Sequence, residues 1–424
     1  MRVKAILTNG KIKYSTMMEL IIIVLLMNSV SLFKVLGRPF TIPFVYKSIN
    51  LILIIILFIM CLNYKDALIG CKYMLISSAL LLTPIALRGI TSNIGIYDYL
   101  RYTITYYFVL LSIPVFCLLK KGKLSLEALL KAIVIVTALS FLLRTAISLL
   151  EFTTGRKLFE AIYMENARED WYRNGILRIN MPCLGLYIIP MILYLIDSVD
   201  KKRKKLYIAI LIFIFTYYLI ILQSRMQMVY AISELIIYMM LKRRSSFKKM
   251  IVCFFLVSII CIILNSTYFE SFINTFSLTS GQFGGSTQIR LLEVESALGM
   301  LRKNPMLGTG ILASDEIVLK YGWTGYLSDI GIFYSTVMLG IFPVIFNIIF
   351  FGRALHAGLL ARKRAKSSGI KHDVLTLSLG MAFVVTCATS DWMNPYYVIN
   401  IPFLFAIVEY INFLYQGKRT LHRI

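Results

Sequence analysis

The stretch LYIAILIFIFTYYLIIL, residues 206–222, decides the fold class, because it is an apolar run without a single charged side chain. A helix needs about 20 mainly apolar residues to cross roughly 30 Å of hydrocarbon. Comparable runs recur along the chain, among them MELIIIVLLMNSVSLF at 18–33. Of the 424 residues 58% are hydrophobic and only 16% are charged. The sequence therefore predicts an all-α integral membrane protein that forms one polytopic membrane domain over residues 1–424.

We expect about twelve membrane spans, and eleven to thirteen are compatible with the pattern. The first apolar run is too long for a cleavable signal, and no small-residue cleavage site follows it. No internal repeat of the kind found in many transporters is visible. The expected spans are 17–36, 42–62, 67–87, 101–119, 128–150, 178–197, 206–222, 226–241, 250–265, 327–351, 374–391 and 396–415.

The charge distribution predicts the orientation of these spans. With both termini inside, the cytoplasmic side holds 29 Lys and Arg against 8 Asp and Glu, and the outer side holds 16 against 13. This asymmetry follows the positive-inside rule, and it predicts a multi-pass membrane protein with both termini in the cytoplasm. The formal charge of +24 is thereby explained by topology and by contact with anionic membrane lipid, so we expect no nucleic-acid partner.

Cysteine and histidine give little support for metal chemistry. The seven cysteines fall inside apolar spans without metal-ligand spacing, which is typical of small packing residues. All three histidines lie on the expected cytoplasmic side. No nucleotide-binding loop and no GxSxG motif is present. We expect neither a metal nor another cofactor.

The longest polar interruption, residues 266–326, is expected to be a large extracytoplasmic loop between the ninth and tenth spans. Ser286 or Thr287 can cap a helix from about Gln288 to Lys303, which Asn304-Pro305 would end. Its apolar stripe predicts a helix on the membrane surface, with Arg290, Glu293 and Ala297 on an adjoining face. The stripe consists of Leu291, Val294, Leu298 and Leu301. The flanking glycines Gly281, Gly284, Gly285, Gly308 and Gly310 are expected to act as hinges.

Several arginines fall on the outer side, where a positive charge is not required for topology. Arg225 lies in a tight turn between the seventh and eighth spans, and Arg290 opens the loop helix. Arg101, Arg144 and Arg178 mark outer ends of spans. A guanidinium binds phosphate oxygens through two parallel hydrogen bonds and stays charged, so this set indicates an anionic ligand. The alternative for each is a structural role, as an interfacial side chain or as the partner of an acid such as Glu293.

Two acids and several aromatic residues complete the candidate site. Asp329 lies at the start of the tenth span and Asp391 at the end of the eleventh. Both are candidates for a polar cavity, and both are equally open to a role as ion-pair partners. Trp323, Tyr326 and Trp171 are candidate ligand-binding aromatic residues, although outer aromatic residues commonly anchor a protein at the membrane interface.

Three segments together resemble a known family. IRLLEVESALGMLRKNPMLGTGI (289–311) has an Arg that opens a helix, then a Pro followed by Gly-x-Gly, and YLSDIGIFYSTVMLGIF (326–342) has an acid shortly before a Gly at the start of a span. ILQSRMQMVYAI (221–232) has a Ser-Arg turn before a span. In order, spacing and outer placement they are similar to the O-antigen polymerase (Wzy) and O-antigen ligase superfamily of bacterial envelope glycosyltransferases, over about residues 206–351.

The resemblance implies a glycosyltransferase of the GT-C type that acts on an undecaprenyl-pyrophosphate-linked oligosaccharide. It implies Arg225, Arg290 and Asp329 as catalytic residues. The remaining outer residues are substrate-binding candidates by their type and position: Arg178, Arg101, Arg144, Glu293, Asp391, Trp323, Tyr326 and Trp171.

The absence of a histidine at one position indicates which branch of the superfamily the chain resembles. Ligases carry one shortly before the acid, where this chain has LKYGWTGYLSD (319–329), so a repeat-unit polymerase is favoured, with a chain-length regulator protein as a possible partner. A ligase-type transferase and a lipid-linked oligosaccharide flippase remain as alternatives.

Overall fold

The computed structural model describes residues 14–30, 32, 43–91, 96–163, 171–173, 175–242, 284–310, 330–364, 371–387 and 397–416. Six helices in this part of the chain are long and apolar enough to cross a membrane. Five shorter apolar helices accompany them. These helices fall at eleven of the expected spans, which makes the chain an all-α multi-pass membrane protein. The expected span 250–265 lies outside the described residues, so the total of twelve remains a prediction.

The N-terminal half contains α1 (Tyr14–Ser29), α3 (Pro43–Cys61), α4 (Lys65–Leu68), α5 (Lys72–Thr91), α6 (Ile96–Thr103), the 3-10 segment η5 (Ile104–Leu111), α7 (Ser112–Lys120), α8 (Leu126–Thr154), α9 (Leu158–Tyr163) and a hairpin of β1 (Tyr172–Arg173) and β2 (Ile176–Leu177). The next part contains η7 (Cys183–Tyr187), α10 (Ile188–Ser198), α11 (Lys201–Tyr217), the π turn η8 (Tyr218–Leu222) and α12 (Arg225–Leu241). The last part contains α15 (Gly284–Lys303), α17 (Ile332–Leu339), α18 (Phe342–Arg364), α19 (His372–Thr386), η10 (Val398–Asn400) and α20 (Ile401–Gln416).

The expected span 327–351 is wrong in its position. A short helix, α17, ends at Leu339 with Gly340 as its C-cap, and the membrane-length helix that follows is α18, from Phe342 to Arg364. Gly340 has a φ of +66°, a left-handed conformation that interrupts the helix. The sequence stays apolar across the break, so hydropathy alone gave no sign of it. The expected span also stopped before Arg353, whose charge is paired inside the protein with Glu409.

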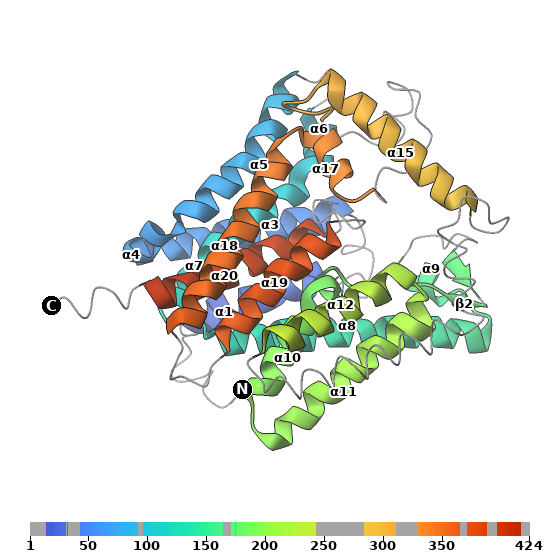
Figure 1. The fold of residues 1–424 in the computed structure, drawn as a ribbon, viewed down its shortest axis with the longest axis horizontal. Helices are drawn as coiled ribbons and strands as arrows, with labels where there is room; N and C mark the ends of the chain where they lie inside the picture. Colours follow the sequence, from blue (N-terminus) through green and yellow to red (C-terminus); the bar gives the residue numbers. More distant parts are fainter. Residues whose placement is uncertain are drawn as a thin grey trace.

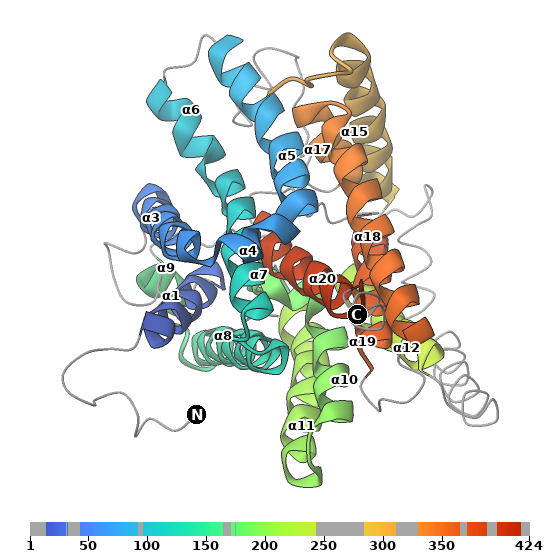
Figure 2. The same ribbon diagram turned by 90° about the vertical axis from the view of Figure 1, so that its left-hand side faces the viewer.

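The centre of the molecule is formed by α18, α19 and α20, which Figures 1 and 2 show beside α7 and α12. Small residues bring α18 and α19 close together. A Cβ on Gly358 would lie 2.5 Å from Leu377 Cγ, and one on Gly380 would lie 2.8 Å from Ala354 Cβ. Close approach of small residues is a common means of packing helices in a membrane, where lipid provides no hydrophobic driving force between them.

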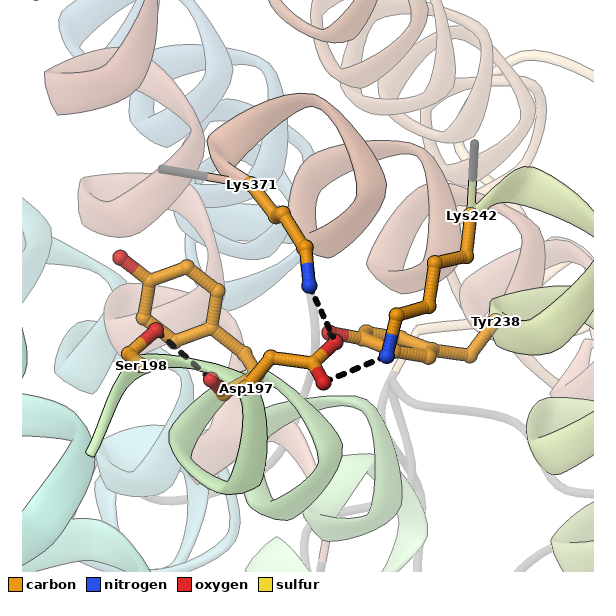
Figure 3. Close-up of polar contacts among 6 residues, drawn as sticks. Asp197, Ser198, Tyr238, Lys242 and Lys371 are labelled. Atoms are coloured by element: carbon orange, nitrogen blue, oxygen red, sulfur yellow. Dashed lines mark hydrogen bonds and ion pairs between the residues drawn. The ribbon is translucent and has the colours of Figure 1, made fainter. Parts of the chain in front are cut away.

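Four helix ends meet in a cluster of charged side chains. Asp197, near the end of α10, pairs with Lys242 at 2.5 Å and with Lys371 at 3.2 Å, and Figure 3 shows its carboxylate between the two ammonium groups. Arg362 of α18 pairs with Asp373 of α19 and donates a hydrogen bond to the backbone oxygen of Leu241, at the end of α12.

These are the ends that the charge pattern assigns to the cytoplasm. Helices α10, α12 and α18 end in this cluster and α19 begins there, so the structure brings the predicted inner ends together. Which face of the membrane this end meets remains a prediction. We call this end the lysine end, and the opposite end, which carries α15 and the β1–β2 hairpin, the loop end (Figure 1).

Candidate functional site

The turn that carries Arg225 has an unusual backbone. The helix α11 widens into the π turn η8, and Gln223 then adopts a left-handed conformation with φ +47° and ψ +33°. Gln223 is the only non-glycine residue with positive φ among the residues described. Such a conformation costs a residue with a side chain roughly 1–2 kcal/mol. Ser224 and Arg225 follow, and Arg225 is the first residue of α12. The structure thus places the backbone of Arg225, while its side chain lies outside what is described.

Residues on and just after the hairpin hold this turn in place. Arg178 Nε donates to the backbone oxygen of Leu222 at 2.9 Å, and Arg173 Nη1 donates to that of Gln223 at 3.0 Å. Gln223 Nε2 donates back to the backbone oxygen of Arg173 at 3.3 Å. Tyr217 Oη donates to the backbone oxygen of Ile179 at 2.5 Å. Sequence reasoning placed Arg178 near this site but missed Arg173, whose guanidinium is exposed.

The hairpin is in turn fixed to the end of α8. Ser148 Oγ donates to the backbone oxygen of Leu177 at 2.7 Å, which ties β2 to the helix. The buried carboxylate of Glu151 accepts hydrogen bonds from Tyr172 Oη and, at 2.9 Å, from the backbone N–H of Phe159. Burial and the bond to Glu151 raise the pKa of Tyr172 to about 12. Its phenol therefore remains protonated, and able to donate, throughout the neutral range.

Trp171 belongs to a small core under the same segment. Its ring meets Phe159 edge-on with a centroid separation of 5.7 Å, and both pack near Ile147, Leu177 and Ile179. The indole is half-buried rather than fully displayed. The structure thus shows a packing contact for Trp171, and its proposed stacking against sugar remains a prediction.

The helix expected in the large loop is present, with an earlier start. It runs from Gly284 to Lys303, so neither Ser286 nor Thr287 caps it, and it ends before Asn304-Pro305 as predicted. Its predicted apolar stripe is only partly turned away from the protein: Leu291 is 56% and Leu298 38% exposed, whereas Val294 is partly buried against the core. The adjoining face packs inward, because Ala297 is completely buried.

The buried face of α15 lies against α17 and contains an acid. Glu293 is only 3% exposed, and Ala297 and Met300 follow on the same face at spacings of four and three. Glu293 lies three residues after Arg290 on the same helix. The backbone of Arg290 belongs to α15, and its side chain is not described. Glu293 is among the substrate-binding candidates expected from the sequence, and the structure shows its carboxylate on the buried face of α15.

The Gly-x-Gly motif after α15 forms backbone hydrogen bonds with α17, and the expected hinge at Gly308 and Gly310 stays a prediction. The backbone N–H of Thr309 donates to Val337 O at 2.7 Å, and that of Gly310 donates to Met338 O at 3.0 Å. The side chain of Arg88, at the end of α5, also donates to the backbone oxygens of Leu307 and Gly308. Arg88 is a second residue that sequence reasoning missed, since nothing in its local pattern indicates contact with residues 219 and 220 positions away.

Arg144 and Arg101 differ in their surroundings. Arg144 is 3% exposed and donates to Ser140 Oγ and to the backbone oxygens of Asn180 and Val30, so it joins α8 to two other segments. Arg101 lies exposed on α6. The remaining predicted site residues, Asp329, Asp391, Trp323 and Tyr326, fall outside the described residues.

Both histidines that the structure describes lie toward the lysine end. His372 begins α19 at that end, stacks on Tyr194 and contacts Tyr415 Oη through Nδ1 at 3.1 Å. His356 Nδ1 lies 3.2 Å from the side-chain amide of Asn412. A helix such as α12 is about 25 Å long at 1.5 Å per residue, and this length separates the turn of Arg225 from the end that His372 adjoins.

A comparison with protein families matches the part of the chain that contains the Arg225 turn and α15. Residues 208–336 match the family model described as O-antigen ligase. The matched segment starts inside α11, contains the turn of Arg225 and all of α15, and ends inside α17. No curated protein matches the chain. The family implies a glycosyltransferase-like activity of the ligase or polymerase type. Residues 208–336 are thus similar to the O-antigen ligase family, which supports the resemblance of this part of the chain to the O-antigen polymerase and ligase superfamily.

Proposed function

We propose that the protein polymerises a bacterial surface polysaccharide by joining undecaprenyl-pyrophosphate-linked oligosaccharide repeat units on the outer side of the cytoplasmic membrane. One observation carries the proposal: a single matched segment of the family contains both the Arg225 turn and the helix of Arg290, and the structure places α15 at the loop end. Two permanent positive charges on that side suit a pyrophosphate-linked lipid.

The reaction explains why arginines are needed. A hydroxyl oxygen of the acceptor sugar forms a bond to the anomeric carbon of the donor, and the bond from that carbon to the lipid pyrophosphate breaks. The pyrophosphate leaves with the electron pair. In the proposal Arg225 and Arg290 stabilise the negative charge that develops on its oxygens, which is a preorganised electrostatic contribution. No nucleotide is required, because the pyrophosphate ester already holds the free energy for the new bond.

The proton of the acceptor hydroxyl needs a base. We assign this role to Asp329, which follows the family motif, with Glu293 and Asp391 as polar groups that orient the substrate. Arg178, Arg101 and Arg144 are the proposed further contacts to the anionic donor, and Trp323, Tyr326 and Trp171 the proposed contacts to sugar rings. A chain-length regulator protein is the proposed partner.

The histidines support a polymerase over a ligase. The resemblance associates the ligase branch with a histidine just before the acid, where this chain has none. The two described histidines pack toward the lysine end of the bundle, on the far side from the Arg225 turn. The remaining histidine, His422, comes after α20 near the C-terminus and is also far in sequence from the matched segment.

Purified protein in detergent, supplied with lipid-linked repeat units and a metal chelator, tests this proposal. A polymerase yields a ladder of products that differ by one repeat unit, which mass spectrometry resolves. A ligase gives one transfer to a second acceptor and no ladder. A flippase leaves the oligosaccharide length unchanged while lipid crosses the bilayer of reconstituted vesicles, and that result would overturn the proposal.

A further inference from the structure

The structure assigns a positioning role to Arg173, a residue of the hairpin that has no part in the chemistry proposed above. We infer that Arg173 fixes the backbone of the turn from which Arg225 projects, and so determines where the Arg225 guanidinium meets the donor pyrophosphate. This inference rests on the proposed function for its effect on catalysis. The structural part of the inference, that Arg173 holds the turn, depends only on the hydrogen bonds between Arg173 and Gln223.

The contact between Arg173 and Gln223 is reciprocal. The Arg173 side chain donates to the backbone oxygen of Gln223, and the Gln223 side chain donates to the backbone oxygen of Arg173. Each residue therefore holds the main chain of the other. Only Ser224 lies between Gln223 and Arg225, so a change in the backbone of the turn alters the start of α12, where Arg225 stands.

The turn at residues 223–225 needs hydrogen bonds from other parts of the chain to stabilise it. Gln223 occupies the left-handed region, which a residue with a side chain adopts only when its surroundings compensate. The N-cap residue of α12, Ser224, makes no capping hydrogen bond with its side chain. The first turn of α12 is thus without its usual local stabilisation, and the bonds from Arg173 to Gln223 and from Arg178 to Leu222 are contacts that hold it.

Arg173 is attached to a rigid base. The strands β1 and β2 pair Arg173 with Ile176 and Tyr172 with Leu177. Leu177 and Tyr172 are bound to Ser148 and Glu151, on the last two turns of the 29-residue helix α8. A continuous series of hydrogen bonds therefore runs from α8 through the hairpin to the turn of Arg225. A guanidinium supported in this way can hold a turn, whereas one on an unanchored loop would move with it.

Hydrogen exchange of the turn tests the structural part without any substrate. The variant Arg173→Gln should exchange the amides of a peptide covering residues 218–230 about fivefold faster than the wild type, which corresponds to the loss of about one net hydrogen bond. Arg156→Gln is the matched control, because Arg156 is an exposed arginine of the same outer segment and its side chain makes no hydrogen bond among those described. Equal exchange in the wild type, the control and Arg173→Gln would overturn the inference.

Kinetics then separate positioning from direct contact with the donor. If Arg173 acts through Arg225, Arg173→Gln should lower kcat about tenfold with little change in KM for the donor, since the interaction lost is one realised in the transition state. In an Arg225→Lys background the same substitution should have almost no further effect. A rise in KM with unchanged kcat, or equal effects in both backgrounds, would contradict positioning.

Failure of the proposed function and failure of the positioning role give different results in these two experiments. If the wild-type protein neither elongates nor transfers any glycan, the proposed function fails, and hydrogen exchange still decides whether Arg173 holds the turn. Arg173→Lys gives a further check on global misfolding. It keeps a donor and a charge, so it should restore most of the slow exchange at 218–230 if the hydrogen bond to Gln223 is what matters.

Discussion

Gly308 and Gly340 hold two segments of the chain in reciprocal backbone contact. A Cβ on Gly308 would lie 2.5 Å from the backbone of Val337 and Met338, and a Cβ on Gly340 would lie 2.1 Å from the backbone oxygen of Met306. Both glycines have positive φ, +63° and +66°. The segment after α15 and the end of α17 therefore approach each other only because neither position carries a side chain. This contact anchors the loop helix that carries Arg290.

Substitution of either glycine by alanine should destabilise the protein. The left-handed conformation alone costs an alanine roughly 1–2 kcal/mol, and the overlap with backbone atoms adds to that cost because backbone cannot move aside. We expect Gly308→Ala and Gly340→Ala to lower the melting temperature in detergent, measured by fluorescence-detected size exclusion after heating.

Gly299 and Gly352 provide matched controls for that measurement. Each lies within a helix, and a Cβ on either would meet no atom within 4 Å. Alanine at these positions should be neutral or slightly stabilising, by up to about 1 kcal/mol. Equal melting temperatures for Gly340→Ala and Gly299→Ala would mean that the close contact between 305–310 and 337–340 does not form.

The buried pair of Arg353 and Glu409 is expected to be stability-critical. Nε and Nη2 of Arg353 each lie 2.6 Å from a carboxylate oxygen of Glu409, and the two side chains are 13% and 4% exposed. Removal of one partner leaves a buried charge uncompensated, which costs about 3–5 kcal/mol. Arg353→Met and Glu409→Leu should therefore each lower the melting temperature strongly. The double variant should recover much of the loss, and additive losses would contradict the pairing.

The three charged residues of Figure 3 should contribute unequally. Lys371 is 34% exposed and lies 3.2 Å from Asp197, while Lys242 is 13% exposed and lies 2.5 Å away. An exposed ion pair is screened and contributes about 1 kcal/mol or less. Lys371→Ala should thus shift the melting temperature little and Lys242→Ala more, while Asp197→Leu, which leaves both lysines without this partner, should shift it most. A larger effect of Lys371→Ala than of Lys242→Ala would contradict this order.

The fold class could be predicted from the sequence because a membrane-spanning helix requires a long, mainly apolar run of residues. Eleven of the expected spans overlap apolar helices, although one of them, 327–351, has the wrong bounds, and the loop helix ends at Lys303 as predicted. The break at Gly340 could not be predicted, because it depends on contact with Met306, 34 residues earlier in the chain, and not on local hydropathy. The start of α15 was missed for a related reason, since two glycines at Gly284 and Gly285 normally disfavour a helix.

Part of the candidate site follows from local sequence patterns, and its role stays a prediction. Arg225 and Arg290 stand in recognisable local patterns, a Ser-Arg turn and the start of an amphipathic helix. Arg173 and Arg88 have no such pattern, and their role comes from hydrogen bonds to residues 50 and about 220 positions away. The sequence also grouped Arg144 with the ligand-binding arginines, although the described contacts of its guanidinium with Ser140, Asn180 and Val30 join parts of the protein to each other.

The orientation of the helices leads to a prediction that needs no substrate. Lys202, near the start of α11, and Arg156, just after α8, are both exposed and lie at opposite ends of the expected spans. In intact cells an impermeant maleimide should label a cysteine at Arg156 and should not label one at Lys202, which becomes reactive only after the membrane is opened. Labelling of Lys202→Cys in intact cells would reverse the predicted topology.

Chain growth should depend on Arg225 and Arg290. Alanine at either position should abolish extension of the glycan while the protein still inserts at normal abundance, because the developing charge on the pyrophosphate would lose a fixed counter-charge. Lysine should rescue poorly, since an ammonium group cannot make the two parallel hydrogen bonds that a guanidinium makes with phosphate oxygens. The measurement is the length distribution of surface glycan on gels, with protein abundance determined on the same samples. Normal chain lengths with Arg290→Ala at wild-type abundance would remove Arg290 from the mechanism, and the same result with Arg225→Ala would remove the turn that Arg173 and Arg178 hold.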